Sequence, residues 1–311
     1  MGIGGAPFAI ADRRGGAIGC ELAQAFARLG SNTTLVEGAE RILVREDRDV
    51  SDLARAALVK DGVTIIEGVA LAAFARIGGA CEARLADRRS IAFDRVVVAV
   101  GRRPRTRGFG LEELGLLESG RLVVDRRLRT RIPTIFAAGD VIGQLQFTHA
   151  AAQYGGAAAI NALLAPLTLS NAAMPAFPFV TYTDPEIGRV GLNEQEAREK
   201  KIPFEVTHYP LGELDRAIAD GAEVGFIKAL TVPGKDRLLG VKIVGAHAGD
   251  MLSEFTLAIR HGLGLEAIFR TTHPYPGWSD AARATAAQWR RAHAPQWALA
   301  CSRRLFDWLR G

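Results

Sequence analysis

The chain has 311 residues, of which 48% are hydrophobic and 23% charged, so it can form real cores and two or three packed units. Its formal net charge is +5 and its pI is near 9.4, but the arginines are scattered among acids rather than gathered with aromatic residues, which argues against nucleic-acid binding. No stretch approaches the ~20 uninterrupted apolar residues of a membrane helix, and no basic segment followed by an apolar run opens the chain, so a cytoplasmic protein without a membrane span is the default expectation.

The first hundred residues alternate between predicted strands and helices, a pattern typical of a nucleotide-binding α/β unit. The predicted elements are a glycine-rich turn at 15–19, a helix at 18–29, a strand at 33–37, a helix at 47–60, a strand at 63–66, a hairpin at 82–93 and a buried parallel strand at 95–101. We assign residues 1–102 to this unit.

The glycine-rich turn is an incomplete dinucleotide fingerprint. Such a fingerprint needs one glycine for the turn, a second for close approach of the pyrophosphate and a third where helix meets strand. With Gly16 and Gly19 in the second and third places, Arg14 falls in the first, and the preceding strand reads Ile-Ala-Asp-Arg-Arg at 10–14. We therefore predict a degenerate first strand and phosphate loop. A purely structural glycine loop stays open as the alternative.

Glu37 ends the next predicted strand, 21 residues after Gly16. This is close to the ~20 residues that separate a glycine fingerprint from a carboxylate that binds the ribose hydroxyls. A carboxylate there repels the extra phosphate of NADP, so NAD is the expected nucleotide. Arg41 and Arg45 keep the choice between the two open.

Gly139 and Asp140 follow a short apolar run, which predicts a buried strand at 134–138 that ends in a tight turn. Ligands bind at the carboxyl ends of strands in open α/β sheets, and the Asp140 carboxylate there can accept hydrogen bonds from sugar or ribityl hydroxyls. The alternative is that Asp140 only caps the following turn. An alanine-rich helix is predicted at 150–164.

After a polar linker at 168–175 the pattern changes to successive strands with helices kept apart, which indicates an antiparallel α+β domain. The predicted strands lie at 179–182, 204–208, 225–230 and 238–244, and the helices at 193–201 and 248–261. From residue 286 the tail alternates Trp, Leu and Phe with arginines, so a tail that lies on a membrane surface is one further possibility.

The three cysteines, Cys20, Cys81 and Cys301, lie too far apart in sequence to form a CxxC or CxxxxC pair, and no Cys/His cluster has zinc spacing. We therefore expect neither a local redox motif nor a metal site. Cys20 reads as a small buried residue in the first helix.

Three segments resemble the class I pyridine-nucleotide disulfide oxidoreductases, the family of glutathione reductase, dihydrolipoamide dehydrogenase and mercuric reductase. Residues 130–155 resemble its second flavin segment, residues 15–23 and 98–104 its pyridine-nucleotide domain, and residues 179–192 and 239–249 its dimerisation domain. The resemblance covers about 15–287. It implies an α/β fold, with a Rossmann-like FAD/NAD(P)-binding unit followed by an α+β dimerisation domain.

The resemblance also divides the chain and assigns cofactors. It implies an NAD-binding domain at 1–102, the remaining part of the FAD-binding domain at 103–168, a dimerisation domain at 176–285 and a tail at 286–311, with FAD and NAD as cofactors and a homodimer as the assembly. The residues implied to bind cofactor are Gly16, Gly19, Glu21, Glu37, Gly101, Gly139, Asp140, Thr148 and His149.

Glu21 matches a family residue near the nicotinamide. The alternative for it is a first-turn acid that complements the helix dipole.

The family's dimerisation domain ends in a His-Pro-Thr motif with a Glu five residues after the His, and the pair relays a proton to the other subunit's substrate. That spacing fits Tyr275 and Asp280, with Pro276 in place, so these two are the implied catalytic residues. Mercuric-reductase-like members also carry tyrosine there. A phenol with a pKa of about 10 mainly donates hydrogen bonds, whereas an imidazole shuttles protons near neutrality. We favour a structural role for His273 over that of a displaced base, and Tyr275 as an ordinary turn residue stays the alternative.

The family's usual chain begins with a flavin-binding βαβ unit and a helix that bears a Cys-xxxx-Cys pair, and neither occurs in this sequence. An internal start, a truncation or a frame error would each account for this. Two functions follow. One is a FAD- and NAD(P)H-dependent oxidoreductase that is active when a separate chain supplies the missing flavin half. The other is a catalytically inactive remnant that binds NAD and dimerises.

Overall fold

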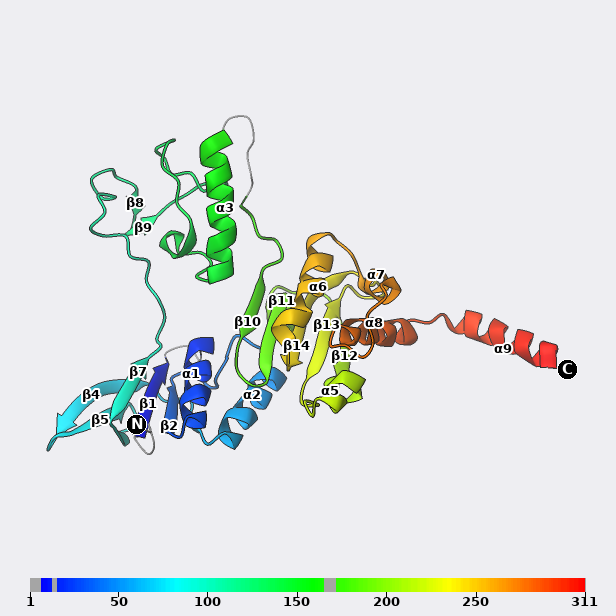
Figure 1. Ribbon diagram of the computed structural model, residues 1–311, viewed down its shortest axis with the longest axis horizontal. Helices are drawn as coiled ribbons and strands as arrows, with labels where there is room; N and C mark the ends of the chain where they lie inside the picture. The colour runs from blue at the N-terminus through cyan, green and yellow to red at the C-terminus, as the bar shows by residue number, and fades with distance from the viewer. Residues whose placement is uncertain (1–6, 13–15, 165–171, 311) are drawn as a thin grey trace. The chain divides into compact units, whose positions relative to one another are not determined.

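A computed structural model of the chain describes residues 7–12, 16–164 and 172–310 (Figure 1). Contacts divide the chain into two compact units, one of Met1–Gly101 with Ala176–Gly311 and one of Arg102–Pro175. In the first unit, a nucleotide-binding part and an antiparallel domain pack together.

The nucleotide-binding part is built on a parallel sheet in the strand order β3-β2-β1-β7. Its elements are β1 (Pro7–Asp12), α1 (Ala17–Arg28), β2 (Asn32–Glu37), α2 (Arg48–Lys60), β3 (Thr64–Ile66) and β7 (Arg95–Val98). The predicted defect in the first strand is wrong as far as the backbone is described, because β1 pairs with both β2 and β7. Asp12 is the last residue of β1, in register with Glu37 at the strand's carboxyl end. Residues 13–15, which contain Arg14, lie outside the described residues.

A small antiparallel sheet interrupts this part between β3 and β7. It consists of β4 (Leu71–Ile77), β5 (Ala80–Leu85) and β6 (Ser90–Phe93). The predicted hairpin corresponds to β5 and β6, and β4 was missed. The predicted strand at 95–101 ends earlier, at Val98, and the chain then turns through Gly101 with a φ of 111°, which favours glycine.

The second unit contains β8 (Leu117–Glu118), β9 (Arg121–Leu122), the 3-10 turn η1 (Gly139–Ile142) and α3 (Thr148–Leu164). The strand predicted at 134–138 is wrong. Only Phe136 makes an isolated bridge, to Arg129. Within the described part of this unit β8 and β9 form the one named ladder, so a longer strand would leave its backbone groups unpaired. The segment bonds locally instead, and the N–H of Ala137 donates to the carbonyl of Leu128 at 2.9 Å.

The carboxyl-terminal domain is an antiparallel sheet in the order β10-β11-β14-β13-β12, as the sequence predicted. Its strands are β10 (Pro178–Thr181), β11 (Glu186–Gly191), β12 (Glu205–Pro210), β13 (Phe226–Thr231) and β14 (Leu238–Gly245). Its helices are α4 (Glu194–Glu199), α5 (Asp215–Ala219), α6 (Ala248–Arg260), α7 (Leu265–Arg270) and α8 (Asp280–Ala292), with η2 (Leu211–Glu213) before α5. Figure 1 shows α6 beside this sheet.

One face of this sheet carries the domain's apolar core. Ile227 and Ile243 point into it, and α6 adds Leu252 and Phe255, which are 1% and 0% exposed. The fully buried residues that α8 adds to this core are alanines, which allows it to approach the sheet closely, and its Trp289 packs against the core. The core therefore lies between the sheet and the helices α6, α7 and α8.

The opposite face carries a row of basic residues on adjacent strands. Cross-strand pairing places the row across β11, β14, β13 and β12, in the order Arg189, Lys242, Lys228 and His208. Lys242 and Lys228 are buried, at 2% and 3% exposure. Like charges directly opposite each other destabilise a sheet unless acids neutralise them. The acids come from the start of α2 and from α4.

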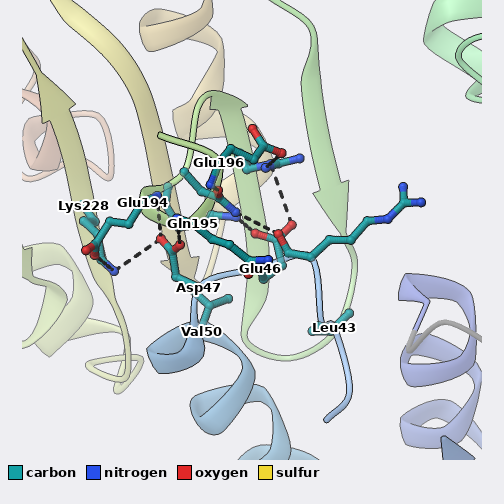
Figure 2. Close-up of polar contacts among 12 residues, drawn as sticks. Leu43, Glu46, Asp47, Val50, Glu194, Gln195, Glu196 and Lys228 are labelled. Atoms are coloured by element: carbon teal, nitrogen blue, oxygen red, sulfur yellow. Dashed lines mark hydrogen bonds and ion pairs between the residues drawn. The ribbon is translucent and has the colours of Figure 1, made fainter. Parts of the chain in front are cut away.

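Lys228 is held by three carboxylates. Its Nζ lies 2.5 Å from Asp49, 2.7 Å from Glu194 and 3.5 Å from Asp47. Figure 2 shows Lys228 with two of these carboxylates, Asp47 from the nucleotide-binding part and Glu194 from the antiparallel domain. Burial alone would lower the pKa of Lys228, but the hydrogen bonds to Asp49 and Glu194 outweigh it and raise the pKa.

Lys242 is the most enclosed member of the row and contacts the Glu46 carboxylate. Burial lowers its pKa well below the usual range. Glu46 lies 3.8 Å from Arg189, whose other partner, Glu196, accepts a hydrogen bond at 2.7 Å. The nucleotide-binding part is thus fastened to the sheet by charges removed from water.

Beyond α8 the chain continues into α9 (Gln296–Arg310), which the sequence had placed in an unassigned tail. Every described side chain of this helix, from 300 to 310, is exposed. In the described residues, no helix combines the length and apolar character needed to cross a membrane.

Candidate functional site

Only residues 13–16 separate the end of β1 from the start of α1. Gly16 is its N-cap residue, with φ −71° and ψ 154°, and carries no side chain that would compete with a phosphate there. Gly19 is buried in the first turn of the helix. Helix amino ends of this kind bind phosphate because their backbone N–H groups and dipole favour an anion.

Glu37 lies at the carboxyl end of β2, paired in register with Asp12 at the end of β1. Its side chain is fully buried, and Oε1 accepts a hydrogen bond from the N–H of Ala39 at 2.5 Å. Arg41, which had kept NADP open, donates instead to backbone carbonyls, among them that of Glu46 at 3.1 Å. Such an arrangement suits the 2′-hydroxyl of NAD better than a phosphate.

Glu21 joins α1 to the antiparallel domain. Its Oε1 accepts a hydrogen bond from the N–H of Tyr182, just after β10, at 2.7 Å. Burial raises the pKa of this carboxyl. The alternative of a first-turn acid is wrong, because the first turn of α1 contains no acid and Glu21 is the fifth residue of the helix.

Gln24, which the sequence analysis did not single out, makes the strongest link between α1 and the antiparallel domain. Its amide nitrogen donates to the Asp184 carbonyl at 2.8 Å and its oxygen accepts from the Asp184 N–H at 2.7 Å. The nitrogen also donates to Asp61 at 2.7 Å. Gln24 is buried, at 4% exposure, and its buried amide is hydrogen-bonded as buried polar groups usually are.

In the second unit, Asp140 occupies the turn η1, and its side chain is 50% exposed. Its carboxylate lies 3.8 Å from the guanidinium of Arg102. Gly139 has a φ of 76°, and a Cβ there would stand 3.2 Å from the Cβ of Ala151, so only glycine brings the turn this close to α3. The helix predicted at 150–164 begins two residues earlier, so Thr148 and His149 are the first two residues of α3, and both are exposed.

Tyr275 and Asp280 line one surface cavity of about 360 Å³, together with His273 and Arg283. The Tyr275–Pro276 peptide bond is cis. Tyr275 is 72% exposed and its hydroxyl donates to the carboxylate of Asp215 at 2.8 Å. This hydrogen bond, with the charge of Asp215, raises the pKa of the phenol.

Sequence reasoning missed Asp215. It begins α5, 60 residues before Tyr275, and no local spacing connects the two. Asp280, the partner that spacing suggested, begins α8 and lies close enough for its charge to contribute to the raised pKa of Tyr275.

His273 is enclosed beside this cavity, with its side chain 5% exposed. Its Nδ1 lies 3.0 Å from the carbonyl of Thr271, and its Nε2 lies 2.9 Å and 3.0 Å from the two oxygens of Glu254 on α6. Both ring nitrogens are thus occupied, which supports the structural role rather than that of a displaced base.

Comparisons with known proteins agree with this arrangement. Residues 15–155 match the pyridine nucleotide-disulphide oxidoreductase family, and residues 177–286 match the dimerisation domain of the same family. The chain belongs to the pyridine nucleotide-disulphide oxidoreductases. The expected fold class is thereby confirmed, with a Rossmann-like FAD/NAD(P)-binding unit followed by an α+β dimerisation domain.

Its relatives include two named dihydrolipoyl dehydrogenase. The one from Thermus scotoductus is 37% identical over 274 residues, and the one from Chlamydia muridarum is 33% identical over 275; each alignment covers 86% of this chain and 58% of the relative. A solved structure, the Cu(II) complex of the HOCl-induced flavoprotein disulfide reductase RclA from Escherichia coli, has a TM-score of 0.83 at 27% identity and covers 91% of this chain and 64% of its own. The chain thus spans a little over half the length of these curated relatives.

Proposed function

We propose that this chain is the NADH-binding and dimerising portion of a FAD- and NAD(P)H-dependent oxidoreductase of the disulfide-reductase or mercuric-reductase type. The observation that carries the proposal is the junction of β1, α1 and β2, with the side-chain-free Gly16 as the N-cap residue of α1 and a fixed carboxylate at Glu37. A dinucleotide needs both, one for its pyrophosphate and one for its ribose. The fit favours NADH because Arg41 is already bonded to backbone carbonyls.

The flavin fits the second unit in part. Asp140 offers a half-exposed carboxylate on a tight turn, and α3 begins with the exposed Thr148 and His149. These side chains can accept hydrogen bonds from hydroxyl groups or donate hydrogen bonds to them. Gly139, which has no Cβ, allows the turn to approach α3 closely. When bound, flavin supplies the hydride acceptor.

The protein's own residues hold the nucleotide-binding helix in place and orient the proposed catalytic pair. Glu21 and Gln24 fix the nucleotide-binding helix α1 against the dimerisation domain through backbone groups of Tyr182 and Asp184. At the proposed catalytic pair, the phenol of Tyr275 has its pKa raised by Asp215, so near neutrality it keeps its proton and acts as a hydrogen-bond donor. Asp280 supplies the charge beside it.

The chain assembles as a homodimer through its dimerisation domain, and the family match of this domain supports that assembly. The three cysteines of this sequence form no CxxxxC pair, so a disulfide relay needs a redox pair, and the other half of the flavin site, from outside these 311 residues, and a separate chain is the source that we propose. A second candidate is a module that binds NAD and dimerises without turnover, because every part that it needs lies in these residues.

Nucleotide binding is tested by titration of the purified chain with NADH and NADPH. We expect tighter binding of NADH. In Glu37→Gln its affinity falls about tenfold, because a hydrogen bond to a charged acceptor is lost, while that for NADPH falls less. The control is Glu40→Gln, whose side chain is 74% exposed. Equal affinities in the parent chain, unchanged in Glu37→Gln, would contradict the proposed site.

Turnover separates the two candidates. The visible spectrum after FAD is added, and NADH oxidation with a disulfide or a mercuric salt as acceptor, are measured with and without a full-length relative as donor of the flavin half. A flavin spectrum with acceptor-dependent oxidation supports the oxidoreductase. NADH binding without a flavin spectrum and without acceptor-dependent oxidation supports the binding module instead.

A further inference from the structure

Helix α9 presents an apolar face that none of the described residues covers. Its large apolar side chains are 53–77% exposed, at Leu305, Phe306, Trp308 and Leu309. Four such residues in five positions are more than the scattered single apolar residues usual on a protein surface. The helix therefore has an apolar face built to contact something other than water.

The apolar and the charged residues of α9 lie on different faces of the helix. At 3.6 residues per turn, Leu305, Trp308 and Leu309 fall on one face, with Phe306 at its edge. Arg303 and Arg310 fall on the opposite face with Asp307, and Arg304 lies at the border beside Trp308. Three arginines against one aspartate leave an excess of two positive charges around the apolar face.

We propose that α9 is an anchor that lies in the surface of a lipid bilayer rich in anionic headgroups. An amphipathic helix with arginines on its polar face and Trp, Phe and Leu on the other lies in the interfacial plane. Tryptophan is favoured at headgroup level, and each arginine gains from a negative leaflet. Its 15 residues span about 22 Å, which is shorter than the hydrocarbon core of a bilayer.

Charge distinguishes this occupant from a second copy of the helix. Two copies paired through their apolar faces would bring the same arginines, among them Arg304, to a shared border, with one aspartate each to offset them. An anionic bilayer satisfies the apolar face and the arginines together.

The helix starts from a fixed point on the dimerisation domain. His293, which follows α8, stacks on Trp289 with ring centroids 4.3 Å apart, and its Nε2 lies 2.9 Å from Glu205 on β12. Only residues 293–295 separate α8 from α9. A bound α9 therefore holds the edge of the domain at β12 and α8 close to the membrane.

The test is flotation of the full chain with two kinds of vesicle, one of phosphatidylcholine alone and one with about a third phosphatidylglycerol. We expect binding to the anionic vesicles only, weakened as salt rises from about 0.1 to about 0.5 M. Trp308→Ser with Leu309→Ser should lower the partition coefficient at least about tenfold. Arg303→Gln and Arg304→Gln should each lower it about fivefold.

Matched controls come from exposed positions elsewhere. Leu163→Ser removes an apolar side chain that is 81% exposed on α3, and Arg107→Gln removes an exposed arginine. Both should bind vesicles as the parent chain does, and circular dichroism checks that each variant folds.

Three outcomes would overturn the proposal. They are absence of binding to anionic vesicles, equal binding to phosphatidylcholine alone, and a loss of self-association in the Trp308/Leu309 variant during sedimentation velocity. The last would identify a second copy as the occupant.

Discussion

Two neighbouring rows of residues cross the dimerisation sheet and face opposite ways. The apolar row runs through Tyr209, Ile227 and Ile243 and packs under α6 and α8. The basic row, one residue along each strand, packs against the start of α2 and α4. Because side chains alternate between faces, a one-residue step changes the chemistry of the contact from hydrophobic burial to ion pairing.

The two contacts differ in what they can specify. Hydrophobic burial is non-directional, so the α6–α8 side gains most of its free energy from area. Ion pairs removed from water repay their desolvation only in one geometry, with Lys228 among three carboxylates and Lys242 against Glu46. Our hypothesis is that the basic row fixes where the nucleotide-binding part sits on the sheet and adds little net stability.

Phe255→Ala should give the largest effect on either face. The ring is fully buried among the sheet and α8, so its removal leaves a cavity and costs about 4 kcal/mol of unfolding free energy. Urea unfolding followed by tryptophan fluorescence measures it. The chain's tryptophans all lie at 278–308, and Trp278 and Trp289 pack on this core.

The control lies on the same helix. Leu257 is 57% exposed, and Leu257→Ala should change the unfolding free energy by less than about 0.5 kcal/mol. Similar losses in both variants would show that α6 does not pack as described.

Glu46→Gln should give the next largest effect, about 3 kcal/mol, because it removes the carboxylate that the buried Lys242 Nζ contacts and leaves that polar nitrogen without its partner. Lys242→Met in the same chain removes that nitrogen and should restore most of the loss. A coupling energy of about 2 kcal/mol in this double-mutant cycle is expected from urea unfolding.

An exposed ion pair gives the matched comparison. Arg28 and Asp184 are 46% and 66% exposed in their side chains, and Arg28→Gln should cost about 0.5 kcal/mol. If Glu46→Gln costs no more than Arg28→Gln, the basic row is hydrated and the hypothesis fails.

The same contrast explains how much of the fold was readable from sequence. Alternating apolar residues predicted most of the antiparallel strands, because one face of that sheet is a hydrophobic core. β11 was missed because Gly188 and Arg189 interrupt its pattern. The arginine belongs to the basic row, and a Cβ at Gly188 would stand 3.0 Å from the carbonyl of Ala248. The strand predicted at 134–138 failed because periodicity shows that a segment is apolar, not that a sheet adjoins it.

The site divides in the same way. Gly16, Glu37 and Asp140 were proposed from spacings within one turn or one strand–helix–strand unit, and their roles stay predictions. Asp215 and Gln24 were missed because each acts on a partner far along the chain, Tyr275 and Asp184 respectively. Contacts across 60 and 160 residues leave no local pattern to read.

The smallest expected effect concerns the apolar row at alkaline pH. Burial, followed by the charges of Glu213, Asp280 and Asp215, raises the pKa of Tyr209 from 10.0 to about 12. The folded chain thus holds this proton more tightly than the unfolded chain. The stability that results is intact below pH 10 and is lost as the pH rises toward about 12.

Tyr209→Phe removes this titration and little else, because the buried ring stays in place. The unfolding free energies of parent and variant should differ by a constant below pH 10, and the parent should then fall relative to the variant up to about pH 12. Urea unfolding at pH 8, 9, 10 and about 11.5 measures this difference. Other groups that titrate in this window are common to both chains, so their contribution cancels. Parallel profiles would mean that the phenol of Tyr209 reaches water and that the apolar face is open at β12.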